Sequence, residues 1–257
     1  HSLTLLVLLL STIAYSQTPI TDDNIKAAID DCRSYDSENC NCPQSEYGRM
    51  ADWDVSNVTN MKDLFRADLF WNNDDFNGNI SNWDVSNVTN MSGMFCQAIN
   101  FNRDISGWDV SNVTNMEGMF AECTFARYIG DWDVSNVTNM SHMFSGRYDS
   151  SATGIWSTSA SGIGNWDVSS VTNMEKMFSH CLSNTQDLDL SNWDVSSVTN
   201  MVGMFVDAKY ITTDVSLWDV ANVTKMNGMF SQANNMNPNL GDWSVEYLVD
   251  AGGMLTG

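Results

Sequence analysis

Basic residues are scarce in this sequence: 11 Lys and Arg stand against 32 Asp and Glu, and the formal net charge is −21. Nucleic-acid binding depends on basic patches that neutralise phosphates, so this shortage excludes a nucleic-acid partner. The same charge opposes binding to an acidic membrane surface and favours cations, basic proteins or neutral glycans. Long apolar runs are also missing after residue 10, so we expect no membrane insertion of the mature chain.

Recognisable catalytic motifs are absent as well. The chain has only three His, and no nucleophile–base pair, phosphate-binding Gly loop or metal-ligand cluster stands at a diagnostic spacing. Paired carboxylates leave a glycosidase open on residue types alone. However, catalytic residues would be unique to one part of the chain, whereas these recur at regular intervals. We therefore expect a non-enzymatic protein that requires no cofactor.

The N-terminal residues predict an export signal. Residues 3–10 form an almost unbroken apolar run that is too short to span a bilayer. Ala14 and Ser16 are small residues at the spacing that a signal peptidase prefers. We therefore predict a signal peptide at residues 1–16 and a mature chain that is secreted or displayed at the cell surface. A buried apolar strand or helix is the alternative.

What the sequence does contain is one phrase, Trp-Asp-Val-Ser-Asn-Val-Thr-Asn-Met-x-x-Met-Phe, which returns eight times with some changes of letter. The copies begin at Trp53, Trp83, Trp108, Trp132, Trp166, Trp193, Trp218 and Trp243. A repeat of this length cannot bury its own apolar face, so the copies must stack on one another. We predict one repeat domain at residues 50–257, with an insertion loop at 145–162 and a degenerate last copy at 240–257 that could serve as a cap.

The columns of the aligned copies separate inward from outward positions. Apolar residues stand three before and two after each Trp, and the following Val, Met and Phe columns step by three or four residues. The alternation around Trp and Val predicts a short strand, and the later spacing predicts one or two helical turns. We therefore predict an α/β repeat solenoid in which each repeat contributes a short parallel strand and short helical turns.

The pattern Ile-x-x-Trp-Asp-Val-Ser-Asn-Val-Thr-Asn-Met-x-x-Met-Phe, present at residues 80–95, resembles the BspA-like leucine-rich-repeat surface proteins. The resemblance is closest to the bacterial surface repeat that also occurs in Mycoplasma lipoproteins, and it covers residues 50–257. It implies a leucine-rich-repeat-like, right-handed stack of coils that is exported or displayed at the surface. It also implies adhesion or protein binding and offers no catalytic motif.

Seven copies carry an Asp directly after the Trp: Asp54, Asp84, Asp109, Asp133, Asp167, Asp194 and Asp219. We expect these carboxylates to point outward. Stacked strands would align them at about 4.8 Å, where each adjacent pair repels by roughly 0.9 kcal/mol in water. One hypothesis is that the column binds calcium. The alternative, which the Asp-x-Ser spacing favours, is that each Asp accepts hydrogen bonds from the Ser hydroxyl or a backbone N–H nearby.

Other polar and aromatic residues are candidate sites of modification or binding. Glycosylation sequons begin at Asn57, Asn79, Asn87, Asn90, Asn112, Asn136, Asn139 and Asn222. The repeat pattern by itself accounts for most of these sequons, so their presence does not require that they are glycosylated. Trp71 lies in the expanded first repeat, and Tyr148 and Trp156 lie in the insertion loop. Insertions in solenoids emerge on one face, so these three aromatics could bind a partner, or they could fold back on the coil.

The six Cys fall into two groups. Cys32, Cys40 and Cys42 precede the first repeat, and in an exported protein they predict a disulfide within an N-terminal cap at residues 17–49. Cys123 and Cys181 occupy a small buried slot of the repeat. Cys96 could reach Cys123 across adjacent coils, and the sequence leaves the connectivity open.

These observations predict a secreted or surface-displayed binding or adhesion protein whose partner is an extracellular protein or glycan. The alternative is a structural component of an extracellular matrix or filament. Such a component could depend on calcium and self-associate through the ends of its stack.

Overall fold

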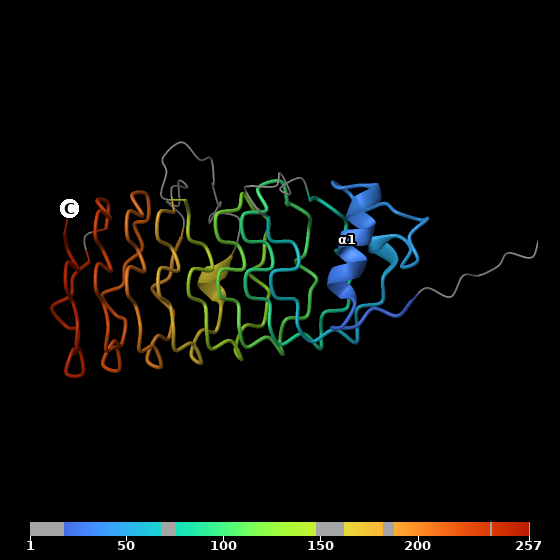
Figure 1. Cartoon of the computed structure of the whole chain (residues 1–257). Helices are drawn as coiled ribbons and strands as arrows, with labels where there is room; N and C mark the ends of the chain where they lie inside the picture. Colours follow the sequence, from blue (N-terminus) through green and yellow to red (C-terminus); the bar gives the residue numbers. More distant parts are fainter. Residues whose placement is uncertain (1–17, 68–75, 148–161, 182–187, 237, 257) are drawn as a thin grey trace, which may run out of the picture.

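The computed structural model describes residues 18–67, 76–147, 162–181, 188–236 and 238–256. Figure 1 shows a row of similar coils stacked along one axis, with helix α1 at one end and the C-terminal coil at the other. We number the coils 1 to 8 by their Trp residues, in chain order. The predicted stacking of repeats is therefore present. The predicted signal peptide and the three candidate binding aromatics, Trp71, Tyr148 and Trp156, lie outside the described residues.

Regular secondary structure is sparse in the described residues. They contain the α-helix α1 (Ile25–Tyr35) and two short 3-10 helices, η1 (Met50–Asp52) and η3 (Ile163–Asn165). The same residues contain no strand. Neighbouring coils meet at isolated parallel bridges of one residue each, from Asn60–Asn90 to Lys225–Asp250. The predicted strand and helical turns of each repeat are therefore wrong for the described coils.

Tight turns explain why no strand forms around the Trp. In coil 2 the Trp83 N–H donates to the Ile80 carbonyl at 3.1 Å, and the Val88 N–H donates to the Val85 carbonyl at 2.9 Å. The chain therefore changes direction on both sides of the Trp-Asp-Val segment, and few residues stay extended. The bridge to the next coil falls at Asn90, seven residues after the Trp.

The Met-x-x-Met-Phe segment forms no helix because its N–H groups point to the next coil. In coil 3 the N–H groups of Met116, Gly118 and Phe120 donate to carbonyls of coil 4 at 2.8–3.0 Å. The residue two after the first Met also has a positive φ, +58° at Gly118, which lies outside the helical region. Successive turns, and not a helix, therefore produce the three-to-four spacing of the inward side chains.

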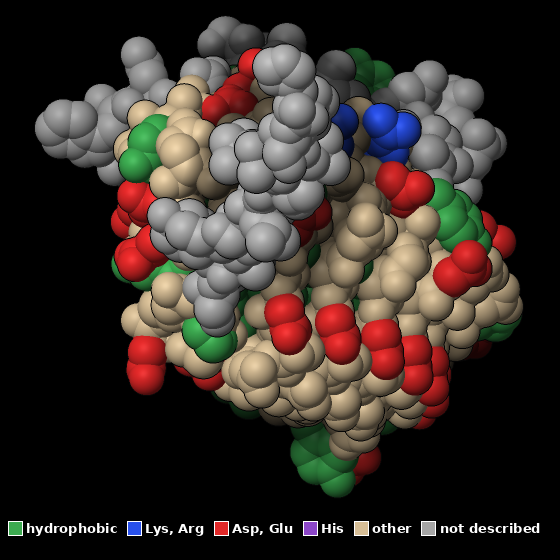
Figure 2. All heavy atoms as spheres, turned by 90° about the vertical axis from the view of Figure 1, so that its right-hand side faces the viewer, with side chains coloured by type: hydrophobic (Ala, Val, Ile, Leu, Met, Phe, Trp, Pro, Cys, Tyr) green, Lys and Arg blue, Asp and Glu red, His purple; other side chains and the backbone are tan. Residues whose placement is uncertain are grey.

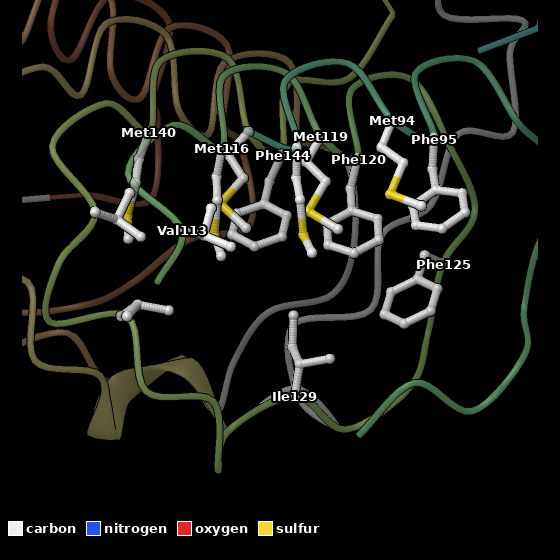
Figure 3. Close-up of a cluster of buried hydrophobic side chains, with 14 of the residues drawn as sticks. Met94, Phe95, Val113, Met116, Met119, Phe120, Phe125, Ile129, Met140 and Phe144 are labelled. Carbon is white, nitrogen blue, oxygen red and sulfur yellow. The ribbon is translucent and has the colours of Figure 1, made fainter. Parts of the chain in front are cut away.

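The apolar columns form one continuous core along the stack, part of which is shown in Figure 3. The Phe95 and Phe120 rings of adjacent coils stack at 5.7 Å between centroids. The Trp108 and Trp132 rings stack at 6.5 Å. In coils 2 to 8 the indole N–H also donates to a carbonyl of the preceding coil, as Trp132 does to Ile105 at 3.2 Å. The inward positions predicted from the columns are confirmed in coils 1 to 7, where the repeated Val and Met side chains are at most 1 % exposed.

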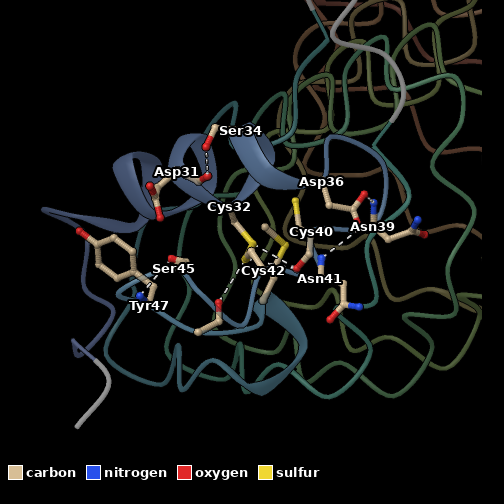
Figure 4. The surroundings of a disulfide bond; sticks show 12 residues. Asp31, Cys32, Ser34, Asp36, Asn39, Cys40, Asn41, Cys42, Ser45 and Tyr47 are labelled. Atoms are coloured by element: carbon tan, nitrogen blue, oxygen red, sulfur yellow. Dashed lines mark hydrogen bonds between the residues drawn. A yellow bond between two sulfur atoms is a disulfide. The ribbon is translucent and has the colours of Figure 1, made fainter. Parts of the chain in front are cut away.

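The residues before coil 1 cover the N-terminal end of this core. Helix α1 buries Ile25, Ala28, Ile29 and Cys32 in the same cluster as the first coil. A disulfide joins Cys32 to Cys42 (Figure 4). Cys40, the third candidate for this bridge, is a buried free thiol. Among the described residues, no helix combines the length and apolar character that crossing a membrane requires.

Asp22 completes this covered end. Its carboxylate accepts hydrogen bonds from the Thr59 N–H (2.8 Å), the Thr59 hydroxyl (2.7 Å) and the Asn60 N–H (3.0 Å). In the next coil the Thr89 N–H donates instead to the Thr59 carbonyl at 2.8 Å. Asp22 therefore takes the place that the carbonyl of a preceding coil would occupy.

Candidate functional site

A column of residues with positive φ runs along the side of the stack. The position two after the first Met of the phrase has a φ between +51° and +66° in every coil. Five coils place Gly there, and coils 1, 4 and 5 place Asp63, His142 and Lys176. The left-handed region is open to Gly without strain and is otherwise most accessible to short polar residues. The side chains present in this column therefore decide where the surface is raised and where it is hollow.

A groove lies where two of these glycines are adjacent. Gly93 and Gly118 stand between Asp63 and His142, and the hollow has a volume of about 320 Å³. A Cβ atom on Gly93 would collide with the Asp63 carboxylate. We call this hollow the glycine groove. The charged or titratable side chains that line it are Lys62, Asp63, Arg66, Cys96, Glu117, Glu122 and His142.

Charged side chains are paired within and across the coils of the groove. The Arg66 guanidinium lies 3.3 Å from the Asp63 carboxylate. Glu122 accepts a hydrogen bond from the Gln97 amide at 3.0 Å and lies 3.8 Å from Arg147. The groove therefore offers both donors and acceptors at fixed positions. Elsewhere acidic groups dominate, and Figure 2 shows a row of Asp and Glu side chains with few Lys or Arg on the face in view.

Burial shifts the pKa values of two groups that line the groove, Cys96 and His142. Burial raises the pKa of the Cys96 thiol to about 11, although the Arg66 charge opposes this effect. Burial, helped by the Lys176 charge, lowers the pKa of His142 below its ordinary value. At neutral pH Cys96 is therefore a neutral thiol. The charged and amide side chains of the groove are suited to hydrogen bonding and charge recognition.

The remaining Cys form no disulfide. Cys96 and Cys123 are both free thiols, so the pairing between them that the sequence left open is not formed. Cys123 and Cys181 are buried in the core, in the small slot expected from the aligned copies.

The Asp column is exposed, and each carboxylate accepts a hydrogen bond from the N–H two residues later at 3.0–3.1 Å. In coils 1 to 4 the Ser hydroxyl adds a second bond at 2.6 Å. The pKa values of Asp54, Asp109, Asp167 and Asp194 are lowered by the Ser two residues later. The Ser side chain is the larger cause and its backbone N–H the smaller one. Across the described residues, no three His, Cys, Asp or Glu side chains gather as metal ligands. Calcium binding by the column stays a prediction.

Several sequon amides serve a role that the sequence analysis missed. The side-chain amides of Asn87, Asn112, Asn136 and Asn222 each donate to a Ser carbonyl of the preceding coil at 2.7–2.9 Å. At Asn79, Asn90 and Asn139 the side-chain carbonyl accepts from the N–H two residues later. Asn57 is exposed in the first coil. The sequons are therefore built into the contacts between or within coils, and their glycosylation stays a prediction.

The glycine groove was also missed, although the sequence carries its signal. Gly alternates with Asp63, His142 and Lys176 at one fixed place in the phrase. Gly, and after it Asp and His, are the residues that favour a left-handed backbone position, so their recurrence at one place indicates such a position. Two adjacent glycines at that position predict a hollow between larger neighbours.

These features define a repeat protein with a polar groove along its side. A family model described as a Mycoplasma protein of unknown function, DUF285, matches residues 34–156 and again residues 148–257. The chain belongs to this family and contains two copies of its unit. No curated protein and no solved structure matches the chain.

Proposed function

We propose that this chain is a secreted or surface-displayed, non-enzymatic binding protein that holds an extracellular protein or glycan on the side of its stack. The repeat's resemblance to BspA-like leucine-rich-repeat surface proteins supports an adhesive role. The Cys32–Cys42 disulfide supports an oxidising compartment, because such bonds persist mainly outside the cytosol. The observation that carries the proposal is the glycine groove.

The groove suits a ligand with many hydrogen-bonding groups. Its walls carry carboxylates and guanidinium or ammonium groups, so both donors and acceptors face the hollow. Its floor is backbone at Gly93 and Gly118, which lets a ligand approach the chain closely. Sugars and polar peptides present the mixed donors and acceptors that this lining matches.

The test fills the groove in one variant and spares it in a matched control. Gly118→His places a side chain in the hollow at φ +58°, and Gly228→His places the same side chain at φ +61° in coil 7, far along the stack. Both changes impose similar backbone strain, and the chain already carries His142 at this position. The two variants and the unchanged chain are applied to an array of neutral and acidic glycans and to a panel of purified extracellular proteins.

We expect a ligand whose affinity falls by about tenfold or more with Gly118→His, about 1.4 kcal/mol, and is retained with Gly228→His. Equal affinity in both variants would move the binding site away from the groove. In that case Trp71→Ala and Trp156→Ala test the predicted aromatic loops with the same ligand. A chain that binds no member of either panel would contradict the proposal.

The alternative of a filament has less support. Growth by stacking needs two free ends, and helix α1 with Asp22 covers the first coil.

A further inference from the structure

A second hollow on the stack shares no residue with the glycine groove. Its volume is about 430 Å³. The guanidinium groups of Arg103 and Arg127 line it, together with the Asp104 carboxylate and several Asn and Ser side chains. Two Arg in one hollow are notable in a chain with only 11 Lys and Arg against 32 Asp and Glu. We call this hollow the arginine pocket.

Stacking of the coils places the two Arg in equivalent positions. Each Arg follows a buried Phe by two residues, and the rings of these two Phe stack at 6.0 Å between centroids. The Arg103 Nε donates to the Asn77 carbonyl at 2.6 Å. One coil further, the Arg127 Nε donates to the Asn102 carbonyl at 2.9 Å. The two guanidinium groups are therefore held in the same way on neighbouring coils.

The charge of this pair is not neutralised within the described part of the chain. Among those residues, neither Arg103 nor Arg127 forms an ion pair with an Asp or Glu. Arg103 makes one further hydrogen bond, to the Asn39 side-chain carbonyl at 3.3 Å. Like charges on adjacent coils repel one another. An anion in contact with both groups would replace this repulsion by attraction.

The lining beside the two Arg favours a ligand that also carries hydroxyl groups. The backbone N–H and the side chain of Ser106 lower the pKa of the Asp104 carboxyl, and the Arg127 charge adds to this effect. Asp104 is therefore ionised at neutral pH, and an ionised carboxylate only accepts hydrogen bonds. The side chains of Asn79 and Ser81 add donors and acceptors. A sugar that carries one anionic group beside several hydroxyls matches this combination.

An exposed aromatic ring follows directly after the second Arg. Tyr128 is 43 % exposed, and its hydroxyl donates to the Asp131 carboxylate at 3.0 Å. A Cβ atom added to Gly130 or to Gly162 would collide with the Tyr128 side chain, so this side chain lies close against both glycines. The face of a fixed aromatic ring offers apolar area that the C–H groups of a sugar ring can cover.

We propose that the arginine pocket binds an acidic saccharide, whose carboxylate or sulfate group lies between Arg103 and Arg127 and whose hydroxyls donate to Asp104. Guanidinium groups suit both kinds of anion, because their fixed donors match pairs of anionic oxygens. The other acidic side chains of the chain repel a polyanion, so affinity depends on this local pair and falls as salt screens it. The inference does not depend on the glycine groove.

The experiment is isothermal titration calorimetry of the purified chain with three oligosaccharides of equal length. One is an oligogalacturonate, the second is its methyl ester, and the third is a sulfated galactan fragment. A chelator is present throughout, so that calcium cannot bridge carboxylates. We expect at least one acidic probe to bind, with an affinity that falls as salt is added, and the neutral methyl ester to bind at least about tenfold more weakly.

Variants then locate the site. Arg127→Gln should raise the dissociation constant of the acidic probe by about tenfold or more, and Arg127→Lys, which keeps the charge but not the fork of donors, should raise it less. Lys225→Gln is the matched control, because it removes one positive charge from an exposed position on coil 7. Gly118→His fills the glycine groove and should leave the affinity unchanged. Thermal melts check that each variant is folded.

Three outcomes would overturn the proposal: no binding of either acidic probe, equal affinity for the methyl ester, or equal effects of Arg127→Gln and Lys225→Gln. A loss of affinity with Gly118→His alone would also overturn it, because the saccharide would then occupy the glycine groove. Binding of only one acidic probe supports the proposal and identifies the anionic group. Failure to find a ligand for the glycine groove leaves the result intact.

Discussion

At the scale of single residues, the repeated Asp–Ser pairs make stability depend on pH. Asp109 accepts from the Ser111 hydroxyl at 2.6 Å and from the Ser111 N–H at 3.1 Å, and these bonds lower the pKa of its carboxyl. A pKa that is lower in the folded state stabilises the fold above the unfolded value, about 3.9. The contribution is lost as the pH falls through the folded pKa.

A pair of opposite substitutions tests this effect. Ser111→Ala should lower the free energy of unfolding slightly at neutral pH, because the hydroxyl bond to Asp109 is lost. Coil 7 has Ala221 in place of the Ser, and Asp219 there accepts only from the backbone N–H. Ala221→Ser should therefore raise stability. Urea titrations should show both differences at pH 7 and neither well below pH 3.9. Differences in the free energy of unfolding that are equal at both pH values would contradict this account.

A thermal melt tests whether the same Asp column binds calcium. If the aligned carboxylates bind calcium, a thermal melt in calcium should lie several degrees above a melt in chelator, because ligands of the folded state stabilise it. The hydrogen bonds from Ser and the backbone already occupy part of each carboxylate. We therefore expect only a small shift. A large shift that disappears when Asp109 and Asp133 are both changed to Asn would establish a cation site.

At the scale of elements, the N-terminal cap depends on one side chain. The pKa of Asp22 is raised by burial but lowered more strongly by hydrogen bonds from Thr59 and Asn60, so it lies below its ordinary value. Asp22→Ala leaves those donors without a protein acceptor. We expect a loss of about 0.5–2 kcal/mol, by analogy with the loss of a helix N-cap. Asp23 is the control, because it is exposed and makes none of these bonds.

Chemical denaturation measures the loss, and amide exchange at Thr59 and Asn60 locates it. Faster exchange at these two residues in Asp22→Ala, with no change in Asp23→Ala, is the expected pattern. Equal stability of the two variants would show that the cap relies on helix α1 and the disulfide alone.

The elements also show what the sequence could and could not predict. The inward columns, the exposed Asp residues and a cap disulfide follow from the aligned copies and from Cys32 and Cys42. The local backbone conformation could not be predicted from the aligned copies. A spacing of three or four residues between inward side chains arises equally from a helical turn and from consecutive tight turns. The choice of Cys42 over Cys40 depends on three-dimensional distance. Asp22 carries no sequence signal, since it stands outside the repeat next to another Asp.

At the scale of the whole molecule, stability should vary along the stack. Each inner coil has two neighbours, so in a polypeptide made to end at residue 257, where coil 8 has one neighbour, opening of coil 8 costs less free energy. In dilute solution, exchange of the Ala251 and Gly253 amides should be fast. The equivalent Met116 and Gly118 amides are bonded to coil 4 and should be slow. Hydrogen exchange followed by mass spectrometry measures this gradient, and uniform protection in all coils would contradict it.

The buried Trp column also gives the molecule an optical property. In four pairs of neighbouring coils the indole centroids are 6.1–6.5 Å apart and the rings lie within 15° of parallel: Trp53–Trp83, Trp108–Trp132, Trp132–Trp166 and Trp193–Trp218. Chromophores at such separations share their excited states, so energy absorbed by one indole passes to its stacked neighbour before it is emitted. The folded stack should therefore show a strong tryptophan circular dichroism couplet and depolarised fluorescence. Both signals should vanish when the coils separate, without any attached label.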